Sequence, residues 1–144
     1  MLRITILSEN TAVRPDLAAE DGLSVFIETD RHKILMDAGW NDVFLSNAEK
    51  LGVPVKEADT AVLSHDHYDH GQSFPLFFER MAGRRYLFYL SSDVLWPGYH
   101  RRPDGTLTST GCGLSDAELI RARVPHRYVE KSVFHPFADE PEVA

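Results

Sequence analysis

The sequence contains a single cysteine, Cys112, so no disulfide bond can form within the chain. It has no apolar run near the roughly 20 residues that a membrane-spanning helix needs. Its amino terminus also lacks the pattern of a secretory signal peptide. These absences predict a cytoplasmic protein with no membrane partner. A lone thiolate can ligate zinc in principle, but a loop cysteine is more often unliganded, so we expect no metal at Cys112.

Positive charge is also scarce. The 144 residues include 15 Lys and Arg against 22 Asp and Glu, which gives a formal net charge of -7 and argues against a nucleic-acid partner. The length and the hydrophobic content of 43% are typical of a folded chain, and we expect one domain over residues 1–144. A sensor for a nucleotide or pterin is a weaker hypothesis, in which phosphate is held by Arg84, Arg85, Arg101 or Arg102.

Histidine and aspartate, by contrast, are concentrated in one stretch, Ser64-His65-Asp66-His67-Tyr68-Asp69-His70-Gly71. Neutral imidazole and carboxylate are the ligands that zinc and similar first-row metals prefer. If the backbone stays extended after the preceding apolar run, His65 and His67 point the same way and can hold one metal. Asp69 and His70 come just after the bend and can reach a second metal beside the first. The alternative is a coincidental cluster of surface side chains in a turn.

The rest of the chain is predicted to alternate between strands and helices, without an internal repeat. We expect strands at Leu2–Leu7, Leu23–Thr29, Lys33–Asp37, Thr60–Leu63, Tyr86–Leu90 and Tyr128–Phe134. We expect helices at Asn41–Leu51, Ser73–Ala82 and Ser115–Ala122. The first four strands should form one mixed sheet, covered by the first two helices. Residues 91–109 are predicted to be a long loop, and His32, at a hairpin tip, is expected to be exposed.

The order H-x-H-x-D-H after a hydrophobic strand resembles the metallo-β-lactamase superfamily. Longer segments resemble one branch of it, the 7,8-dihydropterin-6-methyl-4-(β-D-ribofuranosyl)-aminobenzene-5'-phosphate synthase-like group, over roughly the first two-thirds of the chain. These segments are Ala19–Ser24, Ile34–Gly39, Asn47–Gly52 and Val62–Gly71. Asp37 can be a simple turn residue, since Asp is common in tight turns. The resemblance favours a second interpretation, in which Asp37 accepts a hydrogen bond from a ligating imidazole.

The resemblance implies an α/β fold, an αββα sandwich with a two-metal site at one sheet edge. His65 and His67 would hold the first metal, Asp69 and His70 the second, and Asp69 would also orient the attacking water. Two zinc ions are expected in a complete site, although iron or manganese suits the same ligands. The implied enzyme is a hydrolase in which a metal-held hydroxide attacks a small-molecule ester or phosphoester.

The chain departs from the superfamily in length, because it is about as long as one half of the sandwich. We therefore expect the N-terminal half, a mixed β-sheet with flanking helices, without the later ligands. The later histidines, His100, His126 and His135, are predicted to be surface residues. The alternative function is a non-catalytic metal-binding or scaffold half-domain that needs a partner chain to complete the site.

One sheet of a two-sheet sandwich also has an apolar face that must be covered. We therefore expect one of two outcomes. Either the apolar face is exposed, or it is covered in a homo-oligomer or by a chain that supplies the second half. The side chains that two or three short helices cannot all bury are Val25, Ile27, Ile34, Met36, Val62 and the Phe74–Phe78 cluster.

Overall fold

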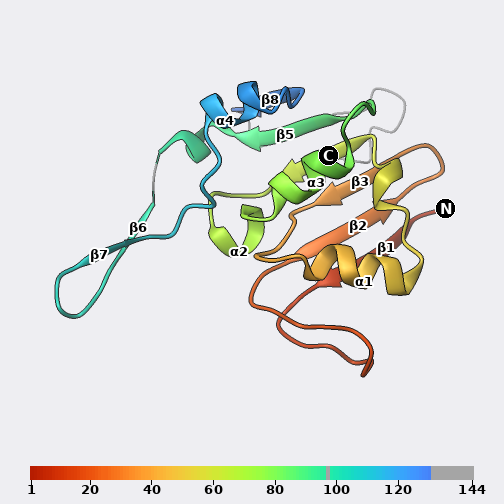
Figure 1. Cartoon of the computed structure of the whole chain (residues 1–144), viewed down its shortest axis with the longest axis horizontal. Helices are drawn as coiled ribbons and strands as arrows, with labels where there is room; N and C mark the ends of the chain where they lie inside the picture. Colours follow the sequence, from red (N-terminus) through yellow and green to blue (C-terminus); the bar gives the residue numbers. More distant parts are fainter. Residues whose placement is uncertain (97, 131–144) are drawn as a thin grey trace.

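The computed structural model describes residues 1–96 and 98–130. Within these residues six strands form one mixed sheet, in the order β1-β2-β3-β4-β5-β8 (Figure 1). The first three strands pair antiparallel, and β3, β4, β5 and β8 pair parallel. Their bounds are Arg3–Ser8, Ser24–Glu28, Lys33–Met36, Thr60–Leu63, Leu87–Ser91 and His126–Val129. The predicted α/β class and mixed sheet are confirmed, and the sheet also takes in β5 and β8.

The core lies between the sheet and a layer of helices. The register places Phe26, Leu35, Ala61 and Phe88 side by side across β2, β3, β4 and β5, and all four are fully buried. Helices α1 (Val43–Leu51) and α3 (Phe74–Arg80) cover this face, as predicted (Figure 1). Helix α4 (Asp116–Arg121) adds to the same core. The helical side chains buried there include Phe44, Ala48, Phe74, Phe77 and Leu119. Burial of these large apolar side chains is the main favourable contribution to folding.

The opposite face of the sheet is apolar as well. The register aligns Ile6, Val25, Met36 and Val62 across β1 to β4. Because side chains alternate along a strand, this row points away from the row that contains Phe26. A second row on the same face is formed by Ile4, Ile27 and Ile34.

Burial on this second face is incomplete, as the sequence predicted. Ile4 and Ile6 are exposed by 59% and 55%. Partial burial is seen for Val25, Ile27, Met36 and Val62. Two parts of the prediction are wrong. Ile34 is buried, and the Phe74–Phe78 cluster packs in the core on the helix side, where Phe74 and Phe78 contact Phe88 of β5.

Helix ends depend on a few polar side chains. Helix α1 begins at Val43 with Asp42 at its cap, so Asn41 does not start the helix as predicted. Ser115 starts α4 as predicted: its hydroxyl accepts a hydrogen bond from the Glu118 N–H and donates one to the Glu118 carboxylate, a reciprocal capping arrangement.

The segment expected as a long loop contains regular structure. Residues Ser92–Leu95 form a 3-10 turn, and β6 (Tyr99–Arg101) pairs with β7 (Leu107–Ser109) in a hairpin, called the hairpin arm below. The arm projects from one end of the sheet (Figure 1). Strand β8 ends at Val129, so only Tyr128 and Val129 of the predicted last strand are in it, and residues 131–134 lie outside the described residues. No helix in the described ranges is long and apolar enough to cross a membrane.

Candidate metal centre

The His/Asp stretch begins where β4 ends, at the carboxyl edge of the parallel part of the sheet. Ser64, His65 and Asp66 form an irregular bend, and His67 has an extended backbone, with φ -123° and ψ 146°. A single helical turn, α2 (Tyr68–Gly71), follows and carries Asp69 and His70. The strand therefore does not continue through the motif: the bend separates His65 from it, and the second pair of predicted ligands lies on a helical turn.

This backbone brings the predicted ligands together. The ring of His65 lies 4.5 Å from that of His67 and 4.2 Å from that of His70, measured between centroids. The Asp69 carboxylate lies 3.7 Å from Nε2 of His70. Burial, followed by the charges of the two neighbouring imidazoles, lowers the pKa of His65. A lowered pKa favours the neutral imidazole, which is the form that binds a metal.

Asp37 holds this cluster in place from the end of β3. Its side chain is fully buried, and its backbone has φ 55°. The carboxylate lies 2.8 Å from Nδ1 of His70 and accepts hydrogen bonds from the N–H and hydroxyl of Ser64 at 2.8 and 2.7 Å. The backbone N–H of Ala38 also donates to the carbonyl of His70 at 2.8 Å. Asp37 thus contacts both Ser64 and His70, and its role beside a ligating imidazole stays a prediction.

Ser64 is a contributor that the sequence reasoning missed. Its hydroxyl donates to Asp37 and lies 2.9 Å from Nδ1 of His65, so that nitrogen donates to the hydroxyl. His65 and His70 are thus both held through Nδ1, which leaves Nε2 of each ring as the lone-pair donor. The only available signal was the position of Ser64 next to the first histidine.

Asp66 is the second missed residue, and it connects the motif to the hairpin arm. Its Oδ1 accepts a hydrogen bond from the Cys112 N–H at 2.8 Å. Two backbone hydrogen bonds lie close to this contact. The Tyr68 N–H donates to the Thr110 carbonyl at 2.9 Å, and the Thr110 N–H donates to the Gly98 carbonyl at 3.0 Å. The base of the arm is therefore bonded directly to the metal motif.

Backbone contacts from the amino-terminal side hold the segment that carries Asp69, the remaining predicted ligand. The Leu23 N–H donates to the Asp69 carbonyl at 3.2 Å. Gly22, at φ +122°, lies so close that a Cβ there would be 2.0 Å from the same oxygen. No larger residue fits at position 22, so the segment before β2 closes tightly over α2.

Of the other candidate residues, the described histidines lie apart from this cluster, whereas Cys112 lies beside it and its N–H is bonded to Asp66. His100 is exposed on β6, as predicted, and His135 lies outside the described residues. The surface prediction is wrong for His126, which is half-buried in β8 with Nδ1 2.9 Å from the Val124 carbonyl. It is also wrong for His32, which is half-buried beside Asp59. Burial raises the pKa of the Cys112 thiol to about 12.

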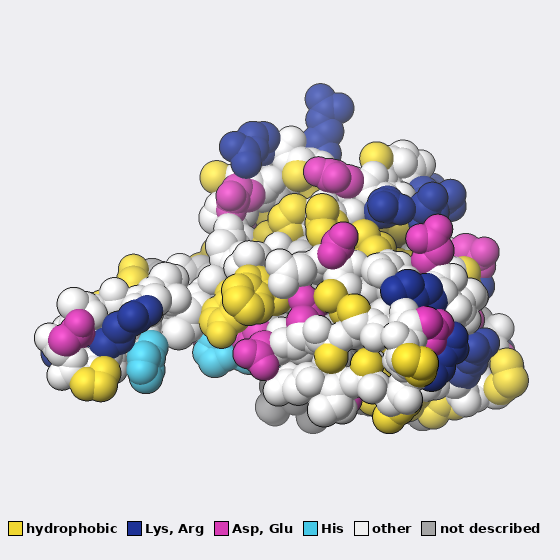
Figure 2. Space-filling view, turned by 60° about the horizontal axis from the view of Figure 1, so that its bottom comes forward, with side chains coloured by type: hydrophobic (Ala, Val, Ile, Leu, Met, Phe, Trp, Pro, Cys, Tyr) yellow, Lys and Arg dark blue, Asp and Glu magenta, His cyan; other side chains and the backbone are white. Residues whose placement is uncertain are grey.

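The donor set has the chemistry of a zinc site, three imidazoles and one carboxylate. Figure 2 shows His side chains at the base of the projecting arm, beside acidic side chains and an apolar patch. Among residues 1–96 and 98–130, however, no three His, Cys, Asp or Glu side chains are grouped closely enough to form a complete set around one ion. The residues fit a metal in type, and their arrangement supplies only part of a coordination shell.

Residues 18–80 match the family model of the metallo-beta-lactamase superfamily. This range contains Asp37 and all four predicted ligands. The predicted resemblance to the superfamily is therefore confirmed, while the assignment to the synthase-like branch stays a prediction.

Two solved structures show the same fold. The metallo-beta-lactamase fold protein YhfI of Bacillus subtilis aligns with a TM-score of 0.56 and 15% identity over 92% of this chain. A metallo-beta-lactamase from Novosphingobium pentaromativorans aligns with a TM-score of 0.50 and 19% identity over 79% of this chain. At these identities the likeness concerns the fold alone, which is the metallo-β-lactamase fold.

The known relatives are longer than this chain. An uncharacterized protein of Methanocaldococcus jannaschii is 34% identical over 101 residues, which cover 58% of this chain and 39% of that protein. The alignments cover 46% of the Bacillus protein and 41% of the Novosphingobium protein. The chain thus spans less than half the length of these proteins, as expected for one half of the sandwich.

Proposed function

We propose that this chain supplies the metal-binding half of a metal-dependent hydrolase that acts on an ester or phosphoester. The observation that carries the proposal is the cluster of His65, His67 and His70, in which the buried carboxylate of Asp37 contacts His70 directly and His65 through Ser64. Hydrogen bonds hold the rings of His65 and His70 at one strand end, which favours a prepared set of ligands even though His65 and His67 are exposed.

In this proposal His65 and His67 hold one ion, and Asp69 and His70 hold a second, with zinc the first choice. A bound zinc ion supplies a Lewis acid and lowers the pKa of a coordinated water. Asp37 accepts a hydrogen bond from Nδ1–H of His70, fixing the tautomer that presents Nε2. Asp69 orients the attacking water through a hydrogen bond to its carboxylate.

The test is zinc titration of the purified chain followed by hydrolysis of a generic phosphodiester and a generic ester. His70→Ala should remove most zinc binding, because it deletes a ligand. His100→Ala is the matched control, since His100 is an exposed histidine on the hairpin arm, and it should leave zinc binding unchanged. Equal zinc binding by the two variants would contradict the ligand assignment.

A second candidate is a non-catalytic metal-binding or scaffold half-domain that needs a partner chain to complete the site. It is favoured by the absence, within the described residues, of three potential ligands grouped around one ion. Four ligands shared between two ions leave about two for each, whereas catalytic zinc sites keep three and a water. One weakly bound ion without turnover would support this candidate over the hydrolase.

A further inference from the structure

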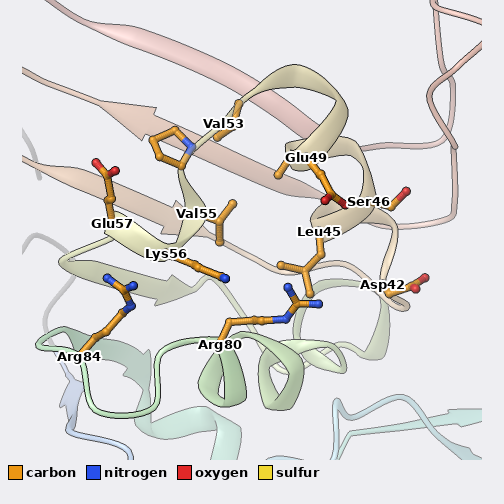
Figure 3. A pocket seen from close by; sticks show the side chains of 12 residues that line it. Asp42, Leu45, Ser46, Glu49, Val53, Val55, Lys56, Glu57, Arg80 and Arg84 are labelled. Carbon is orange, nitrogen blue, oxygen red and sulfur yellow. The ribbon is translucent and has the colours of Figure 1, made fainter.

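A groove with a volume of about 560 Å³ lies in the helix layer, between α1, the 3-10 turn Val55–Glu57 and α3 (Figure 3). This volume is within the range of small-molecule sites. None of the predicted metal ligands lines the groove, and Asp37 does not line it either. The groove is therefore a separate feature, and the proposed hydrolase activity does not account for it.

The floor of the groove is apolar and belongs to the core. Ala48, Val53 and Val55 are buried, and Leu45 is partly buried against them. Because these side chains are held by the same packing that stabilises the sheet, the hollow is present before any ligand arrives.

Three cations extend over this floor. Lys56 comes from the 3-10 turn, Arg80 from the end of α3 and Arg84 from the segment after it, and Figure 3 shows the charged ends of Lys56 and Arg80 in the gap between these elements. With the residues that the structure describes, none of the three makes an ion pair within 4.0 Å. Glu57 also lines the groove, and its carboxylate is paired with Lys33. That hydrogen bond is the main cause of its lowered pKa, and the charge of Arg84 contributes to the lowering.

The opposite wall carries charge of the other sign. Asp42, Glu49 and the hydroxyl of Ser46 line it from α1 (Figure 3). An anion would be attracted to the cationic wall and repelled by the carboxylates, whereas hydroxyl or amino groups could donate hydrogen bonds to Asp42 and Glu49. The groove thus suits a molecule with an anionic end, an apolar middle and a hydrogen-bond-donating end.

We propose that this groove binds a small organic phosphate of the nucleoside monophosphate kind. The phosphate lies among Lys56, Arg80 and Arg84, the ring packs on Leu45 and Val55, and hydroxyl or amino groups face α1. Arginine and lysine are the usual phosphate partners in proteins.

The test is calorimetric titration of the full chain with adenosine monophosphate at low salt, without added metal. We expect one molecule bound per chain, and both adenosine and inorganic phosphate should bind at least about tenfold more weakly, because each lacks one half of the contacts. Omitting the metal makes the result independent of the proposed hydrolase.

The double substitution Arg80→Ala with Arg84→Ala should weaken binding at least about tenfold. The matched control is Arg101→Ala with Arg102→Ala, which removes two exposed arginines from the hairpin arm and should leave the affinity unchanged. Circular dichroism confirms that both variants are folded. Failure of the unmodified chain to bind adenosine monophosphate, or equal affinity of the two double variants, would overturn the proposal.

Discussion

Asp37 is the residue on which the orientation of the candidate ligands depends most. Its carboxylate contacts His70 and accepts two hydrogen bonds from Ser64, so it positions both ends of the metal motif. The residues alone left a simple turn Asp open, and it was the resemblance to the metallo-β-lactamase superfamily that favoured this role. Parallel pairing of β3 and β4 then places both strand ends at one edge of the sheet.

Substitution of Asp37 by Asn should weaken zinc binding by about 10- to 100-fold, because the amide nitrogen cannot accept the hydrogen bonds that orient the motif. Competition with a chelating dye measures this change. Asp59→Asn is the control, since Asp59 is also a carboxylate beside a histidine, His32, but lies outside the motif. An unchanged zinc affinity of the Asp37→Asn variant would contradict the proposal that Asp37 positions the candidate ligands.

Cys112 should react with iodoacetamide far more slowly in the folded protein than in urea, because only the thiolate reacts. Its pKa is raised from 9.0 to about 12 by burial. In the folded protein the rate should therefore keep rising about tenfold per pH unit from pH 9 to 11, whereas in the unfolded chain it levels off above pH 9. Mass spectrometry of the alkylated protein follows both rates. Levelling near pH 9 under native conditions would show that the thiol reacts from an opened state with an ordinary pKa.

Among the elements, the base of the hairpin arm is joined to the metal motif by hydrogen bonds of two residues. Asp66 provides the side-chain contact, through its bond to the Cys112 N–H, and Tyr68 provides the backbone contact to Thr110. Removing the Asp66 carboxylate leaves the Cys112 N–H without its acceptor. This loss costs stability because Asp66 is only partly exposed, so water does not fully replace the acceptor.

Asp66→Ala should lower the free energy of unfolding by about 1–3 kcal/mol, as expected for loss of a hydrogen bond to a charged group. Asp66→Asn keeps a carbonyl oxygen at the same place and should recover part of that loss. Urea unfolding followed by circular dichroism gives both values. If the two variants lose the same stability, the acceptor role of Asp66 is wrong.

The elements also show what the sequence could predict. Strand β4 has the predicted bounds Thr60–Leu63, because a continuous apolar run with polar flanks is typical of a buried central strand. The strands of the hairpin arm were missed because their side chains are exposed on both faces. Such strands lack the alternation of apolar and polar residues that marks a half-buried strand. Helix α2 was missed because a single turn has no periodicity. The contacts of Ser64 and Asp66 join residues 27 and 46 positions apart, beyond what local patterns indicate.

For the whole molecule, the apolar face of the sheet opposite the helices is the main unexplained surface. The longer relatives share this fold, so we propose that a second half, or a second copy of the chain, covers the face. The face begins at the edge strand β1, where Ile4 and Ile6 are more than half exposed. An exposed apolar edge of this kind favours association.

Light scattering should therefore show the purified chain as a dimer or larger species, and Ile4→Lys with Ile6→Lys should shift it toward the monomer. Ile120→Lys is the matched control, because Ile120 is 67% exposed but lies on α4, in the helix layer. A monomeric unmodified chain, or equal effects of the two changes, would contradict association through this face.

The backbone conformation of Asp37 has a consequence for the energetics of the whole molecule. A positive φ, here 55°, is a conformation that L-residues other than Gly, Asn and Asp rarely adopt. Complete burial of a carboxylate adds a desolvation cost to this local strain. Both costs act against the folded state, and both fall on the residue that orients His70. The hydrogen bonds from Ser64 and His70 offset these costs, so the buried acceptor is kept in the folded molecule only while both partners stay in place.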